Sequence, residues 1–500
     1  MEIELKLRLP ASALDGLKAD PLLQLAGKTR TVHKQLDNIY FDTPERKLAE
    51  ARIALRLRKD GRRWLQTVKS GGSAQAGLHS REEIEYAVAG KALEWEALAG
   101  TPIGDMIDPF RAQLQPQFRT RFSREVRLLR GRSGAQIELA VDHGEIIAGK
   151  RREALCEVEL ELKSGAVDDL FELALELVAR HQLVIDNRSK AERGDALARD
   201  LPPASPVKAA PVVLPPGADA QDVARLAVEN CLAHWQANEP GFLAQPSGAR
   251  YDSEHLHQLR VAVRRLRVAC DPLARLASWH TGALASIKSP LRQLGQQLGA
   301  ARDLDVFYDE TWTLLRSCID DAALTMALQE EIDIQRALAQ QRAYAALRGR
   351  AAQRVLLQLG RCLTEPALDA APASAPHAPL NEQLDAFERK LRRGLPELEN
   401  LKPEALHALR IVAKKMRYLT EFSAGLHDDA AVESWLKWLK KAQDVLGARN
   451  DRAVAEARIA SICKTLDALH GEVRRSLLAS LRQRELPELR LPALPEPYWR

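Results

Sequence analysis

The sequence opens with Glu2-Ile-Glu-Leu-Lys-Leu-Arg-Leu9, in which charged and apolar residues alternate strictly. Side chains alternate across a β-strand, so Glu2, Glu4 and Lys6 share one face while apolar residues share the other. The same alternation recurs over residues 53–59, 63–69, 81–88, 135–142 and 155–163. The first two hundred residues therefore predict a mainly β domain.

The charged faces of these segments carry dense rows of both acidic and basic residues. A single face of this kind is typical of a solvent-exposed strand. Several of them fit better if they converge inside a closed barrel, where carboxylates hold divalent cations and Arg or Lys side chains hold an anion. Carboxylate oxygens suit Mg²⁺ or Mn²⁺, so the pattern predicts a metal-complexed polyphosphate as the guest.

A proline-rich stretch, Leu201 to Gly217, marks the clearest domain boundary, because repeated prolines forbid helix continuation. We place a first domain at 1–200, a linker at 201–218 and a second domain at 219–500, since 500 residues exceed one ordinary core. After the linker the apolar period becomes 3.6, which predicts an all-α domain. A Pro/Ala-rich segment at 366–379 divides that domain into halves of about 219–365 and 380–500.

The two helical halves share a repeat. The stretch His257-Gln-Leu-Arg-Val-Ala-Val-Arg-Arg-Leu-Arg267 aligns with His407-Ala-Leu-Arg-Ile-Val-Ala-Lys-Lys-Met-Arg417. Further along, Leu298-Gly-Ala-Ala-Arg-Asp303 aligns with Leu446-Gly-Ala-Arg-Asn-Asp451. Two motifs in the same order at nearly equal offsets predict a duplicated helical bundle.

On a helix, the first member of the repeat places a basic row beside an apolar row. The basic positions are His257, Arg260, Arg264 and Arg267, and their equivalents are His407, Arg410, Lys414 and Arg417. An ordinary solvated helix is the simpler reading of one such row, and the two histidines fit a buried structural role as well. Neither row carries interleaved acidic residues, however, so two uncompensated rows favour a polyanion site.

The composition narrows the class of protein. Six well-separated cysteines without a C-x-x-C pair argue against a zinc site and a disulfide framework. With 5% aromatic residues, and none inside either basic row, stacking platforms for nucleic acid are not expected. The charged opening and the lack of a long apolar run predict a cytoplasmic protein without a membrane partner.

The motifs of the first domain resemble the CYTH superfamily of triphosphate tunnel metalloenzymes. They occur in this order: Glu2-Ile-Glu-Leu-Lys6, Asn38-Ile-Tyr-Phe-Asp-Thr43, Leu55-Arg-Leu-Arg58, Thr67-Val-Lys69, Arg124-Glu125, Val141-Asp-His-Gly-Glu145, Cys156-Glu-Val-Glu-Leu-Glu161 and Ser189-Lys-Ala-Glu-Arg193. The resemblance implies an eight-stranded antiparallel tunnel that uses Mg²⁺ or Mn²⁺. The residues it implies as phosphate-gripping are Lys6, Arg56, Arg58, Lys69, Arg124 and Lys190.

The same resemblance implies that the acidic residues act as metal ligands or as a base that orients water, with Glu2 and Glu4 in the catalytic set. The metal set it implies is Glu4, Asp142, Glu157, Glu159 and Glu161. Arg119 and Arg121 compete with Arg124 for the inward position, and Glu83 and Glu85 are second choices. We expect turns at Thr43-Pro44 and at Gly71-Gly72.

The repeat of the second domain resembles the CHAD family, whose signature is H-x-x-R-x-x-x-[RK]-x-x-R once per half, with L-G-x-x-R-D further on. The resemblance implies paired four-helix bundles with a basic surface that binds inorganic polyphosphate. Arg302 is a further expected ligand, although an ion pair with Asp303 is an alternative. The second copy departs from this pattern, because Asn450 stands where Arg302 stands in the first.

Together these features predict an α+β protein of two domains, similar to bacterial inorganic triphosphatases of the CYTH-CHAD type. We expect hydrolysis of tripolyphosphate to diphosphate and phosphate, with polyphosphate bound by the helical domain and polyphosphate granules as one place of action. Adenylate cyclisation, or hydrolysis of a thiamine or nucleoside triphosphate, is the enzymatic alternative. A non-catalytic polyphosphate-binding scaffold is the alternative from another class.

Overall fold

The computed structural model of the chain describes residues 2–25, 31–202, 204–245, 252–270, 281–364, 377–465 and 471–500. The chain divides into two compact units. One unit comprises Met1–Pro203 and Arg348–Glu365, and the other comprises Ala204–Leu347 and Pro366–Arg500. The chain therefore passes between the units at 203/204, at 347/348 and at 365/366.

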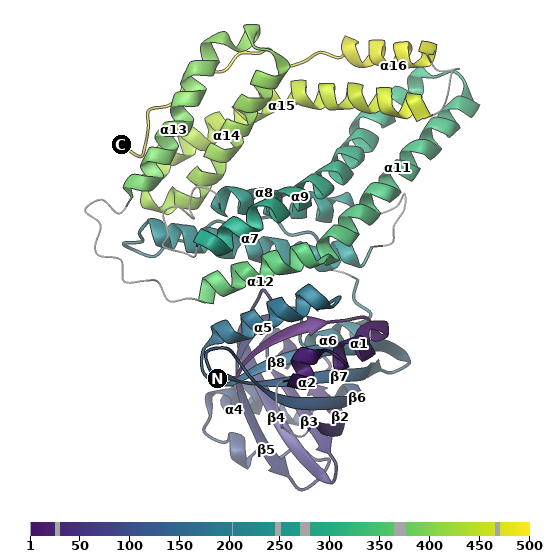
Figure 1. Cartoon of the computed structure of the whole chain (residues 1–500), viewed down its shortest axis with the longest axis vertical. Helices are drawn as coiled ribbons and strands as arrows, with labels where there is room; N and C mark the ends of the chain where they lie inside the picture. Colours follow the sequence, from purple (N-terminus) through teal and green to yellow (C-terminus); the bar gives the residue numbers. More distant parts are fainter. Residues whose placement is uncertain are drawn as a thin grey trace. The chain divides into compact units, whose positions relative to one another are not determined.

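An antiparallel barrel fills the first unit (Figure 1). Its strands pair in the order β5-β4-β3-β2-β6-β7-β8-β1, and β1 closes the ring on β5. This confirms the expected eight-stranded fold. The strands are β1 (Glu2–Arg8), β2 (Val32–Asp42), β3 (Ala54–Asp60), β4 (Arg63–Gln75), β5 (Leu78–Val88), β6 (Gln115–Arg130), β7 (Gln136–Ala148) and β8 (Arg151–Ser164).

Six of these strands coincide with the segments expected from alternation, whereas β2 and β6 were not expected. The turn expected at Thr43-Pro44 is present. The turn expected at Gly71-Gly72 is wrong, because both glycines lie inside β4, where the register with β5 shifts between Lys69 and Gly72. Gly72 has φ +154°, and a Cβ atom there would lie 2.1 Å from the Ser80 carbonyl oxygen. The glycine pair therefore makes a β-bulge.

Short helices decorate the barrel: α1 (Leu14–Lys18), α2 (Pro21–Leu25), α3 (Lys47–Glu50) and α4 (Pro102–Ile107). A longer helix, α5 (Val167–Arg180), contacts β1 and β8, and its Leu170, Phe171, Ala174, Leu177 and Val178 are buried. The apolar face of β1 is also fully buried at Leu5 and Leu7. The other face of β1 is left to the barrel interior, which separates the apolar core from the charged cavity.

Helix α6 (Lys190–Arg199) follows the short strand β9 (Val184–Ile185) and packs on β6, β7 and β8. Its start is fixed by a capping box, in which Ser189 Oγ accepts from the Glu192 amide and the Glu192 carboxylate accepts from the Ser189 amide. Ala191 and Leu197 pack against a buried cluster containing Tyr40 and Phe118. The first residue of this helix is Lys190.

The second unit is mostly helical, as expected. Its principal helices are α7 (Ala220–Leu243), α8 (Ser253–Cys270), α9 (Thr281–Val306), α11 (Ala322–Arg348), α13 (Ala378–Gly394), α14 (Pro403–Ser423), α15 (Asp429–Thr465) and α16 (Gly471–Gln483). A π-helical turn, Phe307–Trp312, leads into the short α10 (Thr313–Leu315). On α8 the predicted apolar row of Leu256, Leu259, Val263 and Leu266 is fully buried.

The predicted halves of the helical domain share one core. Phe307, Trp312 and Ile332 of the first half lie in a single buried cluster with Ile459 and Leu477 of the second. Helix α12 (Arg350–Thr364) departs further from the predicted halves, because it belongs to the first unit and contacts α5 there (Figure 1). The domain ranges drawn from the prolines therefore differ from the packing.

All six cysteines are free thiols. No helix in the described parts of the chain combines the length and the apolar character needed to cross a membrane.

Gly194 tests whether α6 depends on close packing. A Cβ atom at this position would lie 2.1 Å from a ring carbon of Phe118, which is itself buried. We expect Gly194→Ala to lower the free energy of unfolding by about 1–3 kcal/mol through overpacking, although alanine favours a helix. Urea unfolding measures it. In the control Gly16→Ala nothing lies within 4 Å of the new atom, so a loss of equal size there would contradict the packing argument.

Candidate functional site: a charged tunnel and a cationic cavity

The barrel encloses a cavity of about 730 Å³. Every predicted phosphate-gripping residue lines it, as do Glu2, Glu4, Glu159 and Glu161. The full charged lining is Glu2, Glu4, Lys6, Lys34, Arg56, Arg58, Lys69, Arg81, Glu83, Glu85, Arg124, Glu138, Glu159, Glu161, Lys163 and Lys190. We call this cavity the tunnel.

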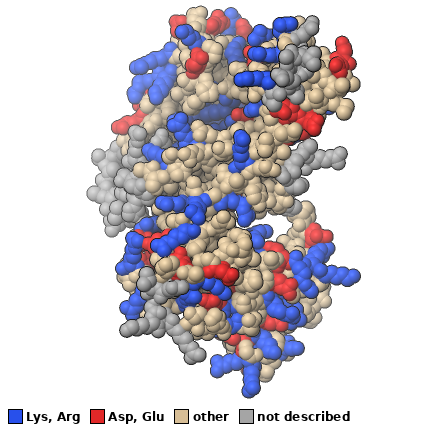
Figure 2. All heavy atoms as spheres, turned by 45° about the vertical axis from the view of Figure 1, so that its right-hand side comes forward, with Lys and Arg blue, Asp and Glu red and all other residues tan. Residues whose placement is uncertain are grey.

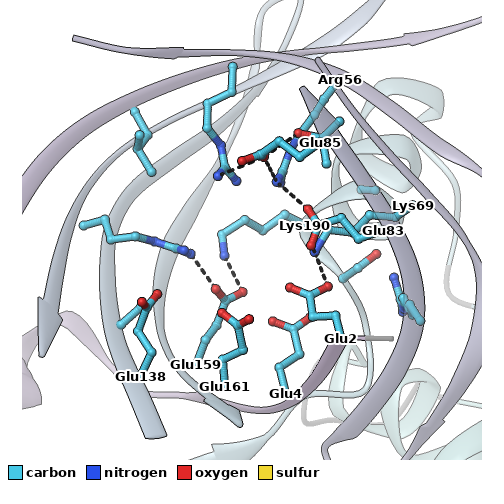
Figure 3. Close-up of a pocket in the computed structure, with 18 of the residues that line it drawn as sticks. Glu2, Glu4, Arg56, Lys69, Glu83, Glu85, Glu138, Glu159, Glu161 and Lys190 are labelled. Carbon is cyan, nitrogen blue, oxygen red and sulfur yellow. Dashed lines mark hydrogen bonds and ion pairs between the residues drawn. The ribbon is translucent and has the colours of Figure 1, made fainter. Parts of the chain in front are cut away.

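The tunnel lining holds two concentrations of charge. Carboxylates from β1, β7 and β8 gather at the lower side of Figure 3, and we call Glu2, Glu4, Glu138, Glu159 and Glu161 the acidic wall. Arg56 lies on the opposite side with Glu85 beside it, and Arg58 also contacts Glu85. We call Arg56 and Arg58 the basic side. Lys69 and Arg124 bond carboxylates of the wall.

The acidic wall places like charges opposite one another. Glu4 is the direct neighbour of Glu161 across the β1–β8 pair, and Glu161 is the direct neighbour of Glu138 across the β7–β8 pair. Like charges in these positions destabilise a sheet. Lys6 Nζ offsets Glu4 at 2.8 Å, and Lys163 Nζ offsets Glu161 at 2.6 Å.

Glu2 pairs with Lys69 Nζ at 2.5 Å, yet its pKa is raised. Burial raises its pKa to about 7, and the neighbouring Glu4 and Glu83 carboxylates act in the same direction against the attraction of Lys69. Burial would also raise the pKa of Glu4, but Lys6 lowers it to about 2. Glu2 is therefore poised to exchange a proton near neutral pH.

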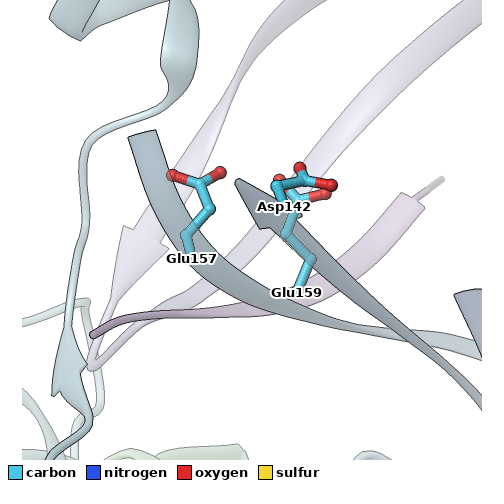
Figure 4. Close-up of side chains that lie close together, drawn as sticks. All are labelled: Asp142, Glu157 and Glu159. Carbon is cyan, nitrogen blue, oxygen red and sulfur yellow. The ribbon is translucent and has the colours of Figure 1, made fainter. Parts of the chain in front are cut away.

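Asp142, Glu157 and Glu159 form a separate buried triad, drawn in Figure 4. Their oxygens lie within 4.8 Å of one another, which is close enough to share a metal ion. The Lys190 ammonium already bonds all three, at 2.8 Å from Asp142 and 2.8 Å from Glu159 as well as to Glu157. Asp142 and Glu157 are outside the tunnel lining, unlike Glu159.

Two arginines complete this triad. Arg124 donates to both oxygens of Asp142 at 2.7 Å and also bonds Glu159. Arg193 is 1% exposed and donates to Glu157 at 2.9 Å and to the Ala154 carbonyl. Burial alone would raise the pKa of Glu159, yet Lys190, Arg124 and Lys6 hold that pKa well below its usual range.

The helical unit has a cavity of its own, of about 820 Å³. On the face drawn in Figure 2, Lys and Arg side chains line a hollow in the upper part of the picture. The predicted polyphosphate ligands that line this cavity are His257, Arg260, Arg264, Arg302, His407, Arg410 and Lys414. We call it the cationic cavity. Arg267 and Arg417 are not among the described residues that line it, and Arg417 pairs with Glu421 at 2.8 Å.

The repeat builds the two sides of this cavity in the same way. Arg260 pairs with Asp303 at 3.1 Å, and the equivalent Arg410 pairs with Asp451 at 3.5 Å. A Cβ atom on Gly299 would contact the Arg260 guanidinium at 3.6 Å, and one on Gly447 would contact Arg410 at 3.8 Å. The L-G-x-x-x-D spacing thus provides room and a counter-charge for one arginine in each copy.

Arg302 and Asp303 have different partners in the described part of the chain. The Arg302 guanidinium donates to Ser253 Oγ at 3.1 Å, at the start of α8, while Asp303 pairs with Arg260. In the second copy, Asn450 in place of Arg302 bonds His407 Nδ1 at 2.8 Å. The two copies therefore differ at this corner of the cavity.

Comparison with known proteins matches a family to each part of the chain. Residues 1–194 match the CYTH domain family, and residues 226–460 match the CHAD domain family. The chain is a CYTH–CHAD protein.

Three relatives illustrate the similarity. An inorganic triphosphatase of Haemophilus influenzae is 34% identical over 199 residues, which cover 38% of this chain and 54% of that protein, so the match spans about half of its length. An uncharacterised protein of Mycobacterium tuberculosis is 26% identical over 466 residues, covering 85% of this chain and 82% of that protein. The CHAD domain of Ricinus communis is 26% identical, with a TM-score of 0.46, and covers 56% of this chain and 90% of that one.

Strand parity decides which arginine of β6 enters the CYTH tunnel. Arg124 points inward, while Arg119 and Arg121 lie on the exposed outer face, where Arg119 pairs with Asp37. Odd and even positions of one strand point to opposite faces, so the sequence could have settled this. Sequence reasoning missed Lys34 and Glu138 in the lining.

Two overlapping groups of carboxylates are candidates for a divalent cation, and cations of the chain already contact both. On the acidic wall, Lys6 pairs with Glu4 and Lys163 pairs with Glu161. In the triad, Lys190, Arg124 and Arg193 bond the carboxylates, whose oxygens lie close enough to share one ion. The metal ligands expected from the sequence, Glu4, Asp142, Glu157, Glu159 and Glu161, therefore stay predictions.

Substitution of Lys190 tests how far the buried triad depends on its shared ammonium group. Lys190→Met leaves three buried carboxylates without their shared cation, so we expect the free energy of unfolding to fall by about 3–5 kcal/mol. Urea unfolding in EDTA measures the loss. Lys34→Met is the control, since Lys34 pairs with Asp60 at a side-chain exposure of 40% and such a pair contributes at most about 1 kcal/mol. Equal effects of the two changes would show that the triad does not need Lys190.

Proposed function

We propose that the CYTH domain is a metal-dependent inorganic triphosphatase that cleaves tripolyphosphate to diphosphate and phosphate. The observation that carries this proposal is that one cavity holds both the basic side, Arg56 and Arg58, and the acidic wall. A triphosphate with divalent cations needs both surfaces at once. A site for an anion alone would be hindered by the acidic wall.

The basic side would bind the phosphate oxygens. Arg56 and Arg58 come from adjacent inward positions of β3, and both are held by Glu85, at 3.8 Å and 3.7 Å. Arg58 also donates to Asn38 Oδ1 at 2.9 Å, which fixes its direction. Guanidinium groups fixed in this way stabilise the charge of phosphoryl transfer without reorganising, which is where most of the catalysis of such reactions arises.

The acidic wall would serve the other half of the reaction. Glu4, Glu159 and Glu161 would hold Mg²⁺ or Mn²⁺, which supplies charge neutralisation and Lewis acidity at the phosphate oxygens. Glu2, whose pKa lies at about 7, is the best proton acceptor in the tunnel for the attacking water. Burial of these groups keeps bulk water from screening the charges.

The lining also favours an inorganic substrate. Among the described residues that line the tunnel, the aromatic side chain is that of Tyr40, and its ring already stacks on Phe118 with centroids 4.5 Å apart. Phe118 thus occupies one face of the Tyr40 ring, which leaves the lining little aromatic surface for a nucleobase or thiazole ring to stack on. The Haemophilus influenzae relative, named an inorganic triphosphatase, supports the same choice.

The test is phosphate release from tripolyphosphate, ATP, thiamine triphosphate and long-chain polyphosphate, each with Mg²⁺, Mn²⁺ or EDTA. We expect metal-dependent release with tripolyphosphate preferred, and a loss of about 10²-fold in kcat/KM for Arg56→Ala, because one fixed charge donor is removed. Arg121→Ala on the outer face is the matched control and should leave the rate unchanged. Preference for ATP or the thiamine ester would replace the substrate, and no release with any of the four would favour a binding scaffold.

We further propose that the cationic cavity of the CHAD domain binds inorganic polyphosphate and so keeps the enzyme near its substrate. The support is electrostatic. Burial lowers the pKa of Lys414 to about 7, and repulsion by Arg264, Arg410 and Arg260 adds to the effect. The pKa of Arg260 is lowered in the same way. Cations that suppress one another's charge gain most from a polyanion.

Lys414 makes this binding pH-dependent. Its pKa is lowered in the free protein, so above pH 7 the amine is increasingly neutral and must take up a proton when polyphosphate binds. We expect affinity to fall as pH rises from 7 to 9, by up to about tenfold per unit, and to flatten in Lys414→Met. Calorimetric titration at constant ionic strength measures it. The exposed Lys440→Met should keep the wild-type slope, and a slope that survives in Lys414→Met would contradict the assignment.

A further inference from the structure

Helix α12 lies inside the range that matches the CHAD family, yet it packs on the CYTH barrel. Its Arg361 makes a paired hydrogen bond with the Asp168 carboxylate and a second contact with Glu172 at 3.3 Å, both on α5. At the other end, Arg350 donates to the carbonyl of Arg180, the last residue of α5. The two helices are therefore joined at both ends.

Gln353 of α12 completes an edge of the barrel. The two-residue strand β9 pairs with β1 on one side only, so the amide of Ile185 points away from the sheet. That amide donates to Gln353 Oε1 at 2.8 Å, and the bond is buried. A buried amide without a partner is costly, so β9 depends on α12 for its outer hydrogen bond.

The chain from Ile185 to Lys190 is held at nearly every step. The Asp186 amide donates to the Lys6 carbonyl at 3.3 Å, and Asn187 Oδ1 accepts from the Gly77 amide at 2.8 Å. Ser189 then caps α6, whose first residue is Lys190. Because these hydrogen bonds hold the segment from Ile185 to Lys190, we expect a displacement of Ile185 to displace Lys190 as well.

We propose that α12 is a positioning element of the CYTH tunnel, and that Gln353 sets the placement of Lys190 through strand β9. The tunnel domain is then incomplete without a helix supplied by the CHAD half of the chain. The effect on kcat can be measured only if the chain has the triphosphatase activity proposed above, so that part of the inference rests on the proposed function. Hydrogen exchange at the Ile185 amide can be measured whether or not the chain is active.

The close packing around Gly360 of α12 allows a second test of the docking of this helix. A Cβ atom on Gly360 would lie 2.6 Å from the Ala76 side chain and 2.9 Å from the Phe171 ring. Ala76 precedes Gly77, whose own added Cβ would lie 3.1 Å from Ile185. Alanine favours a helix over glycine, so harm from Gly360→Ala would report the docking of α12 and not its helicity.

The experiment uses the full chain. Gln353→Met keeps the volume and removes the acceptor. We expect it to speed hydrogen exchange at the Ile185 amide by about tenfold and to lower kcat for tripolyphosphate by a similar factor at temperatures where the protein is fully folded. Gly360→Ala should reproduce both losses, and Arg354→Ala at an exposed position of α12 should cause neither.

The outcomes separate the two proposals. If the wild-type chain hydrolyses none of the substrates, the proposed function fails, and the inference is then decided by Ile185 exchange and by the calorimetric affinity for tripolyphosphate. If the wild-type chain is active and both Gln353→Met and Gly360→Ala keep its kcat, the inference is overturned. Unchanged exchange at Ile185 in Gln353→Met would overturn it as well.

Discussion

The contact between the Lys190 ammonium and three buried carboxylates is the interaction on which the CYTH barrel depends. Asp142 comes from β7, Glu157 and Glu159 come from β8, and the lysine comes from α6. Burial of any one of these charges alone would destabilise the fold. Burial of all of them is tolerated because each is paired with an opposite charge in good geometry. The contact therefore fixes α6 against the barrel.

The inward direction of the charged side chains on β1, β3 and β8 follows from the alternation of side chains along a strand. Positions 2, 4 and 6 of β1, positions 56 and 58 of β3, and positions 159 and 161 of β8 all point inward because side chains alternate. Register then sets which charges meet, for instance Lys6 beside Glu159 and Glu4 beside Glu161. One cavity thus obtains a basic side and an acidic wall from a pattern that is visible in each strand.

Strand parity also explains which features of the fold and the site could be predicted from the sequence. The inward set on β1, β3 and β8 follows from alternation, and so does the buried face of α8. Strands β2 and β6 escaped notice because arginines occupy both faces of β6 and the first part of β2 is exposed on both sides, which erases the alternation. The Gly71-Gly72 bulge and the docking of α12 arise from contacts distant in sequence, such as Gly72 with Ser80 and Gln353 with Ile185, and local pattern cannot reveal them.

The buried Lys190 and the half-buried Lys414 show that removal from water alone does not set the charge state of a lysine. Burial acts on both in the same direction, by disfavouring the charged amine. The pKa of Lys190 nevertheless lies far above its usual range, because Asp142, Glu157 and Glu159 surround it. The pKa of Lys414 is lowered to about 7, because its neighbours Arg264, Arg410 and Arg260 are cations. Lys190 is therefore paired within the fold, whereas Lys414 faces cations from both copies of the repeat.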